Sequence, residues 1–255
     1  MSFPPCFFPI KIYIALLFCY HNIFSFSILT GMCALTRAGS RGSGRTPLDW
    51  EARMRSALSA ARGLAHLHTA HNLVHGNVKA SNVLLRPDPD AAALPDFSLH
   101  QLFAPSSARA GGYRAPEVVD SRRLTFKSDV YSLGVLLLEL LTGRCPGSEL
   151  PNGGVVVELP RWVQSVVREE WTSEVFDLEL MKDKGIEEEM VAMLQLALSC
   201  AAAAPEQRPK IGYVVKMIDE VRACGEASPS HDESVDESSG VSDSPAVSEG
   251  GALSQ

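Results

Sequence analysis

A run of almost entirely apolar residues at 129–141 limits the fold of this chain more than any other segment. Its sequence, DVYSLGVLLLELL, is hydrophobic on nearly all sides of a helix and stops at Thr142-Gly143. A helix of this kind must be buried in protein, and it is too short to cross a membrane. The sequence therefore predicts a helix enclosed by the rest of a folded domain.

The segments on both sides of this run also favour helices. Asp49 can cap a helix whose apolar residues between Met54 and Ala65 recur every three or four positions. A short strand and three further helices are expected at 83–85, 160–170, 187–202 and 211–223. Because strands are scarce, the predicted fold class is mostly α.

The first 36 residues differ in character from the rest of the chain. The run at 12–20 is apolar, and its extension to residue 35 gives enough length to cross a bilayer, with a histidine and an asparagine near the middle. Three arginines follow between residues 37 and 45, an arrangement that would place the downstream domain in the cytosol. Two interpretations stay open: a membrane anchor through residues 12–35, or a non-homologous start that carries no function.

The net charge of −7 comes from the C-terminal tail. Residues 225–255 hold seven acidic and no basic residues, and removing those seven from the thirty acidic residues leaves 23 against 23 basic residues. No basic face therefore suggests nucleic acid as a partner. The tail is rich in Ser, Glu, Asp, Gly and Pro and cannot bury enough apolar area to offset the entropy of ordering, so it is expected to be disordered.

Seven short motifs occur along the chain in a fixed order. They are Leu48-Asp49-Trp50, Gly63-Leu64-Ala65-His66-Leu67-His68, the run from His75 to Asn82, Asp96-Phe97, Gly112-Tyr113-Arg114-Ala115-Pro116-Glu117, Ser128-Asp129-Val130-Tyr131-Ser132-Leu133-Gly134-Val135 and Gln207-Arg208-Pro209. In this order and spacing they resemble the C-terminal lobe of protein kinases, and more closely that of plant leucine-rich-repeat receptor-like kinases. The resemblance divides the chain into an apolar segment 1–36, a kinase-like lobe 37–224 and the tail 225–255.

The resemblance implies a site for ATP and magnesium. Asp96 and Asn82 match the two residues that hold magnesium ions on the nucleotide phosphates, and hard oxygen ligands suit that ion. Lys79 matches the lysine that neutralises the transferred phosphoryl group.

The resemblance also implies structural roles for five residues around this site. Glu117 and Arg208 match a buried ion pair, and Asp129 matches the residue that tethers the catalytic-loop backbone. His75 and Phe97 match residues that stack in the core and hold the metal-binding loop in place.

The chain departs from the kinase pattern at the catalytic base. Asn77 stands where the family has an aspartate, and a neutral amide can orient a hydroxyl but cannot take up its proton near neutral pH. Gly76 replaces an arginine that clamps an activation-segment phosphate in many kinases. Ser98 replaces the glycine after Asp-Phe, and Ala110-Gly111-Gly112 lacks the threonine common in the family. Together these departures argue against phosphoryl transfer.

The residues before position 49 show a second departure. None of them resembles the Gly-rich loop, the strand lysine or its partner glutamate, which form the roof of the nucleotide site in kinases. The N-terminal lobe is therefore expected to be absent or largely absent. Asp96, Asn82 and Lys79 would then be open to water, where electrostatic contacts are weak. ATP and Mg²⁺, implied by the resemblance alone, are not expected to bind tightly.

Three functions follow as hypotheses. The first is an inactive, truncated receptor-like kinase homologue, a pseudokinase that binds other signalling proteins or kinases. The second is an active Ser/Thr protein kinase that binds ATP and transfers phosphate to protein, and the third is an incomplete gene product without independent function. The six cysteines show neither zinc-site spacing nor a disulfide framework, which fits a cytoplasmic kinase-like domain.

Overall fold

The computed structural model describes most of the predicted kinase-like lobe. The described residues are 33–34, 48–85, 92–94, 112–119, 123–147, 158–169 and 172–226. The predicted membrane segment, except for residues 33–34, and the predicted disordered tail beyond residue 226 lie outside this part of the chain. Within the described ranges, no helix combines the length and hydrophobicity needed to span a bilayer.

The described part of the chain is mainly helical. Its helices are α3 (Trp50–Ala70), α4 (Phe126–Thr142), α5 (Leu159–Arg168), α6 (Thr172–Val175), α7 (Glu187–Cys200) and α8 (Ile211–Glu226), with short 3₁₀ turns η1 (Ala80–Asn82), η4 (Leu180–Lys182) and η5 (Pro205–Gln207). The mostly α prediction is confirmed, and the expected helices lie within a few residues of their predicted bounds.

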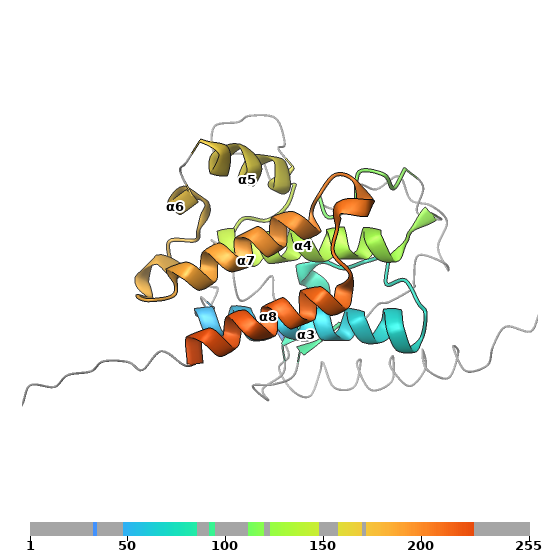
Figure 1. Cartoon of the computed structure of the whole chain (residues 1–255), viewed down its shortest axis with the longest axis horizontal. Helices are drawn as coiled ribbons and strands as arrows, with labels where there is room; N and C mark the ends of the chain where they lie inside the picture. Colours follow the sequence, from blue (N-terminus) through green and yellow to red (C-terminus); the bar gives the residue numbers. More distant parts are fainter. Residues whose placement is uncertain are drawn as a thin grey trace, which may run out of the picture.

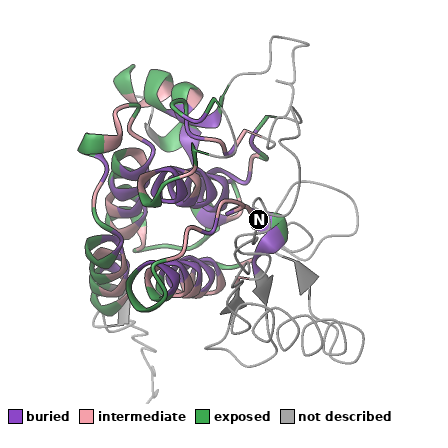
Figure 2. Cartoon of the chain, turned by 90° about the vertical axis from the view of Figure 1, so that its right-hand side faces the viewer, coloured by how far each residue is buried: buried purple, intermediate pink, exposed green. Residues whose placement is uncertain are grey.

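Four of these helices enclose the core. In Figure 1, α7 runs beside α4 and α8 runs beside α3, and contacts between α3 and α4 and between α7 and α8 join the two pairs. The pair α5 and α6 packs together, and α5 also contacts α4. Figure 2 shows that the inward faces of the helices are the buried ones.

Three strands of two residues each are the only strands in the described ranges. They are β1 (Cys33–Ala34), β2 (Leu84–Leu85) and β3 (Ala92–Ala93), which form an antiparallel sheet in that order. The register pairs Cys33 with Leu85 and Leu84 with Ala93. The strand predicted at 83–85 is confirmed, and a piece of the segment 1–36 pairs with it.

Helix α4 is the buried helix that the apolar run predicted. It starts three residues earlier than the run, because Thr125 and Ser128 form a capping box in which each side-chain hydroxyl accepts a hydrogen bond from the other residue's backbone N–H. It ends at Gly143, whose positive φ of 64° suits a glycine. The side chains of Leu133, Leu136 and neighbouring residues are fully buried, as expected.

A glycine allows α4 to lie directly against α7. A Cβ atom on Gly134 would lie 2.7 Å from the Cβ atom of Cys200 and 2.9 Å from the carbonyl oxygen of Ala197. These distances are too short for ordinary contacts, so no larger side chain fits at this crossing. Helices α4 and α7 are therefore in close backbone contact at Gly134.

The helical core also contains a buried ion pair. Arg53 of α3 donates to Asp177 at 2.8 Å and to the carbonyl oxygen of Leu140 at 2.7 Å, and its side chain is only 3% exposed. Asp49 caps the start of the same helix by accepting a hydrogen bond from the Ala52 N–H at 2.8 Å, as predicted. The ion pair joins the start of α3 to the segment after α6, and the hydrogen bond to Leu140 joins it to the end of α4.

Candidate functional site

The candidate site is the loop of residues 75–82, which follows α3 and includes η1. Its side chains differ in exposure: His75 is fully buried and Asn82 is nearly so, while Asn77 and Lys79 are half-buried. The half-buried residues are those that the resemblance assigns to catalysis. The buried ones link the loop to the core.

Asp129, in the first turn of α4, holds the start of this loop. Its carboxylate accepts hydrogen bonds from the backbone N–H groups of His75 at 2.7 Å and Gly76 at 2.8 Å, and it contacts Nε2 of His68 at 2.9 Å. Gly76 has a φ of 75°, a conformation in which most other residues are strained. The glycine that replaces the kinase arginine therefore suits the backbone bend that Asp129 holds.

Asn77 lies at the predicted position of the catalytic base, and its backbone is fixed on both sides. Its N–H donates to Nδ1 of His75 at 3.2 Å, and its carbonyl oxygen accepts a hydrogen bond from Nδ2 of Asn82 at 2.9 Å. These two hydrogen bonds order the backbone of residue 77 and hold it in place. The amide side chain at this position cannot ionise and so cannot take up a proton near neutral pH.

The described residues contain one of the two predicted magnesium ligands. Asn82 uses its amide nitrogen to hold Asn77, which leaves the amide oxygen as its ligand atom. An amide oxygen with a carboxylate is a donor set that suits Mg²⁺. Asp96, the second ligand, and Phe97 lie outside the described residues, as does Ser98. Asn82 and Asp96 would hold the ion and Lys79 the phosphates, and these roles stay predictions.

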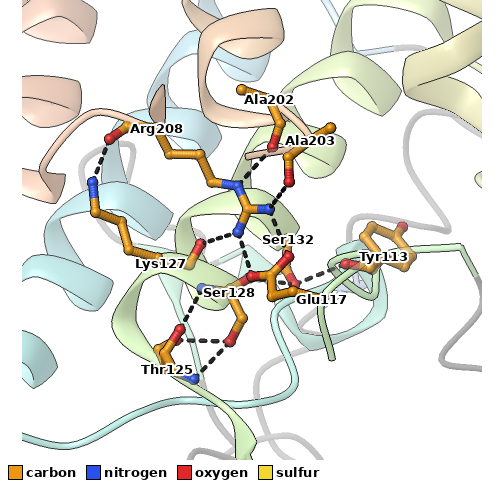
Figure 3. A network of polar contacts seen from close by, with 9 residues as sticks. All are labelled: Tyr113, Glu117, Thr125, Lys127, Ser128, Ser132, Ala202, Ala203 and Arg208. Atoms are coloured by element: carbon orange, nitrogen blue, oxygen red, sulfur yellow. Dashed lines mark hydrogen bonds and ion pairs between the residues drawn. The ribbon is translucent and has the colours of Figure 1, made fainter. Parts of the chain in front are cut away.

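The predicted ion pair between Glu117 and Arg208 is present, with the Arg208 side chain fully buried and that of Glu117 30% exposed (Figure 3). Two guanidinium nitrogens donate to the two carboxylate oxygens at 2.6 and 2.7 Å. The guanidinium also donates to the carbonyl oxygens of Ala202, Lys127 and Ala203 at 2.8, 2.9 and 3.0 Å. Partial burial would raise the pKa of Glu117, but the Arg208 hydrogen bonds outweigh it and lower that pKa.

A second buried polar contact was not predicted from the sequence. The hydroxyl of Tyr113 donates to the carboxylate of Glu139 in α4 and accepts a hydrogen bond from the N–H of Ala80 at 3.3 Å. It connects the segment 112–119 to the loop and to the central helix. The available signal was Glu139 itself, because a glutamate inside an otherwise apolar helix needs a polar partner.

The burial of Glu139 makes its contribution to the stability of the chain depend on pH. Burial raises the pKa of Glu139 from 4.5 to about 7, even though the hydrogen bond from Tyr113 acts in the opposite direction. Because the folded-state pKa is raised, the contribution is fully present below about pH 4.5 and is lost as pH rises through about 7. Glu139→Gln stays neutral, so the variant should gain stability relative to the wild type as pH rises through this window. Urea unfolding at a series of pH values measures the difference.

The matched control for this variant is Glu220→Gln. Glu220 is half exposed and pairs with Lys216 on the surface of α8. Its replacement should leave the pH dependence of unfolding close to that of the wild type. A stability difference between Glu139→Gln and the wild type that does not change with pH would contradict the assignment of a raised pKa.

Comparison with known proteins gives the family of the chain. The family model described as protein tyrosine and serine/threonine kinase matches residues 27–218. The chain is 55% identical over 230 residues to a probable leucine-rich repeat receptor-like protein kinase of Arabidopsis thaliana, covering 85% of this chain and 33% of that protein. It is 50% identical over 196 residues to a probable inactive receptor kinase of the same plant, covering 75% of this chain and 30% of that protein.

A solved structure gives the same result. The pseudokinase domain of BIR2, an immune regulator of the RLK/Pelle family, matches with a TM-score of 0.59 and 32% identity, covering 71% of this chain and 55% of that one. The chain spans about a third of the length of the curated relatives named above. The prediction of a kinase-like C-terminal lobe is confirmed. The chain belongs to the protein kinase family, and plant leucine-rich-repeat receptor-like kinases are among its relatives.

Proposed function

We propose that this chain is a pseudokinase, a receptor-like kinase homologue that acts in signalling by binding other proteins and does not transfer phosphate. The observation that carries this proposal is Asn77. Its backbone is fixed by His75 and Asn82 at the position where a kinase needs a carboxylate. General-base catalysis contributes roughly 10²- to 10⁴-fold to rate, and an amide cannot supply it.

The same loop supports a binding role because its structural contacts are intact. Asp129 holds the start of the loop, and Arg208 holds Glu117, the last residue of the Tyr-Arg-Ala-Pro-Glu motif. With these polar contacts the chain can keep a folded surface that other proteins bind, although it lacks the base for catalysis. We propose cytoplasmic signalling proteins as the partners. Several relatives are named as probable inactive receptor kinases, which supports a role in signalling without phosphate transfer.

We also propose that Mg-ATP binds this chain weakly. Asn82, Asp96 and Lys79 supply the lower part of a phosphate site. The residues before position 49 show no glycine-rich phosphate loop and no strand lysine with a partner glutamate. Without those contacts, charged groups facing water hold a nucleotide poorly.

The test is a radiometric phosphorylation assay on the full chain with Mg-ATP and generic protein substrates. The proposal expects no incorporation above background for the wild type, for Lys79→Ala or for the surface control Lys184→Ala. Incorporation by the wild type and Lys184→Ala that Lys79→Ala abolishes would overturn it. A thermal-shift titration with Mg-ATP tests nucleotide binding separately, and no shift in the melting temperature at millimolar nucleotide is expected.

A second candidate function is phosphoryl transfer by an unorthodox active site. Asn82 and Lys79 favour it, because both are retained and lie on the ordered loop beside residue 77. The relative named as a probable receptor-like protein kinase favours it as well. The radiometric assay decides between the two candidates, since only this one requires Lys79-dependent incorporation.

A further inference from the structure

Two histidines outside the candidate site bring their ring nitrogens together at the end of α3. Nε2 of His66 lies 3.2 Å from Nε2 of His71. The ring centroids are 4.8 Å apart, farther than the nitrogens, so the Nε2 corners of the two rings face each other. Both residues are exposed, and neither contributes to the contacts of the loop at 75–82.

The fold holds this pair in place through the turn that ends α3. His71 is the C-cap of the helix, and the next residue, Asn72, has a positive φ of 52°. The Leu73 N–H then donates to the carbonyl oxygen of Leu67 at 3.0 Å across the turn. Five positions separate the two histidines, so a straight helix would not stack them as it does residues four apart. The turn brings the His71 ring back towards His66 instead.

The spacing of the two nitrogens suits a shared metal ion. Neutral imidazole nitrogen is a common ligand for Zn²⁺, Cu²⁺ and Ni²⁺. With zinc–nitrogen bonds of about 2.0–2.1 Å, a separation of 3.2 Å corresponds to a nitrogen–zinc–nitrogen angle of roughly 100–106°, close to tetrahedral. The separation of the two nitrogens is therefore compatible with one ion bound by both rings.

We propose that His66 and His71 form a surface binding site for a divalent transition-metal ion. In the described ranges no group of three or more His, Cys, Asp or Glu side chains is placed to hold a metal. The two histidines are thus the protein ligands, and water or an added ligand completes the coordination. Imidazole ligands select zinc, copper or nickel over magnesium, which prefers oxygen.

A metal bound here would act on the end of α3 and the turn that follows it. The loop at 75–82 starts four residues after His71, so the ion would stabilise the segment that connects α3 to this loop. An ion that binds the folded chain and not the unfolded chain raises the melting temperature as its concentration rises. The competing arrangement is a hydrogen bond between the two rings, with one nitrogen protonated and the other accepting.

The experiment is a zinc titration of the chelator-treated full chain, followed by calorimetry and by the melting temperature. We expect one zinc ion per chain, a rise in melting temperature with zinc, and no comparable rise with magnesium. Changes outside the ligand shell weaken metal sites about 10–100-fold, so loss of a ligand in His66→Gln or His71→Gln should weaken zinc binding by at least roughly tenfold. Both residues are exposed, so the metal-free variants should unfold like the wild type.

Two variants serve as matched controls. His100→Gln and His231→Gln each remove a histidine outside the described residues and should leave the zinc affinity unchanged. Absence of zinc binding at micromolar concentrations would overturn the proposal and leave the pair as hydrogen-bonded rings. Zinc binding that survives both His66→Gln and His71→Gln, or that depends on a control histidine, would also overturn it.

Discussion

Replacing Arg208 by methionine is expected to lower the free energy of unfolding of the chain by about 3 kcal/mol, because buried acceptors that lose their donor each cost about 1–3 kcal/mol. The Arg208 side chain is fully buried and donates to Glu117 and to three backbone carbonyl oxygens. Methionine fills part of the volume but donates nothing. The carbonyl oxygens are then left without their donor, and Glu117, which is 30% exposed, regains only part of its hydration. Urea unfolding followed by circular dichroism measures the change.

Arg161→Met is the matched control for this variant. Arg161 pairs with Glu158 three residues before it, and its side chain is 74% exposed. Such surface pairs contribute little, so the control should lie within about 0.5 kcal/mol of the wild type. If Arg208→Met were as stable as Arg161→Met, the hydrogen bonds in Figure 3 would not be what holds the segment 112–119 to the end of α7.

The prediction of the helices from sequence succeeded because their signals are local. The run at 129–141 is apolar on nearly all sides and Gly143 stops it, so both the burial of α4 and its end could be predicted. Asp49 lies next to the periodic apolar residues of α3 and caps them, as expected. The start of α4 could not be predicted from the apolar run, because Thr125 and Ser128 cap the helix three residues before the run begins.

The buried polar contacts could be predicted only in part, because their partners are far apart in sequence. Glu117 and Arg208 were paired through the kinase resemblance, although 91 positions separate them. The contact between Arg53 and Asp177, 124 positions apart, was missed, because a lone arginine in a helix usually lies on its exposed face. The contact between Tyr113 and Glu139 was also missed, although Glu139 lies in an otherwise apolar helix. A charged residue on an apolar helix face shows that a partner exists without showing which one.

The loop at 75–82 shows how the structural and chemical parts of a kinase site can separate. Asp129 makes its contacts through backbone N–H groups of the loop, so these contacts do not depend on which side chain stands at position 77. We therefore expect the bend of the loop to be the same with an aspartate or an asparagine at position 77. Asp129, and not the residue at position 77, should determine the stability of the loop.

Replacing Asp129 by asparagine is expected to lower the free energy of unfolding by about 3 kcal/mol or more, because buried donors that lose their acceptor each cost about 1–3 kcal/mol. The carboxylate is 2% exposed and serves the N–H groups of His75 and Gly76 as well as His68. An asparagine keeps the shape but has one acceptor oxygen, and its NH₂ group faces donors. Urea unfolding measures the global loss. Hydrogen exchange of the His75 and Gly76 amides measures the local one.

The exchange measurement separates a tether from a general contribution to the core. If Asp129 holds the loop, the amides of His75 and Gly76 should lose more protection in Asp129→Asn than amides in the middle of α7, which lie far from the replaced carboxylate in the sequence. Asp219→Asn removes the carboxylate of an exposed pair with Arg62 and should change neither stability nor exchange measurably. An equal loss of protection in the loop and in α7 would show that Asp129 stabilises the lobe as a whole. The order of the loop would then have to come from the contacts of Asn82 and His75 with residue 77.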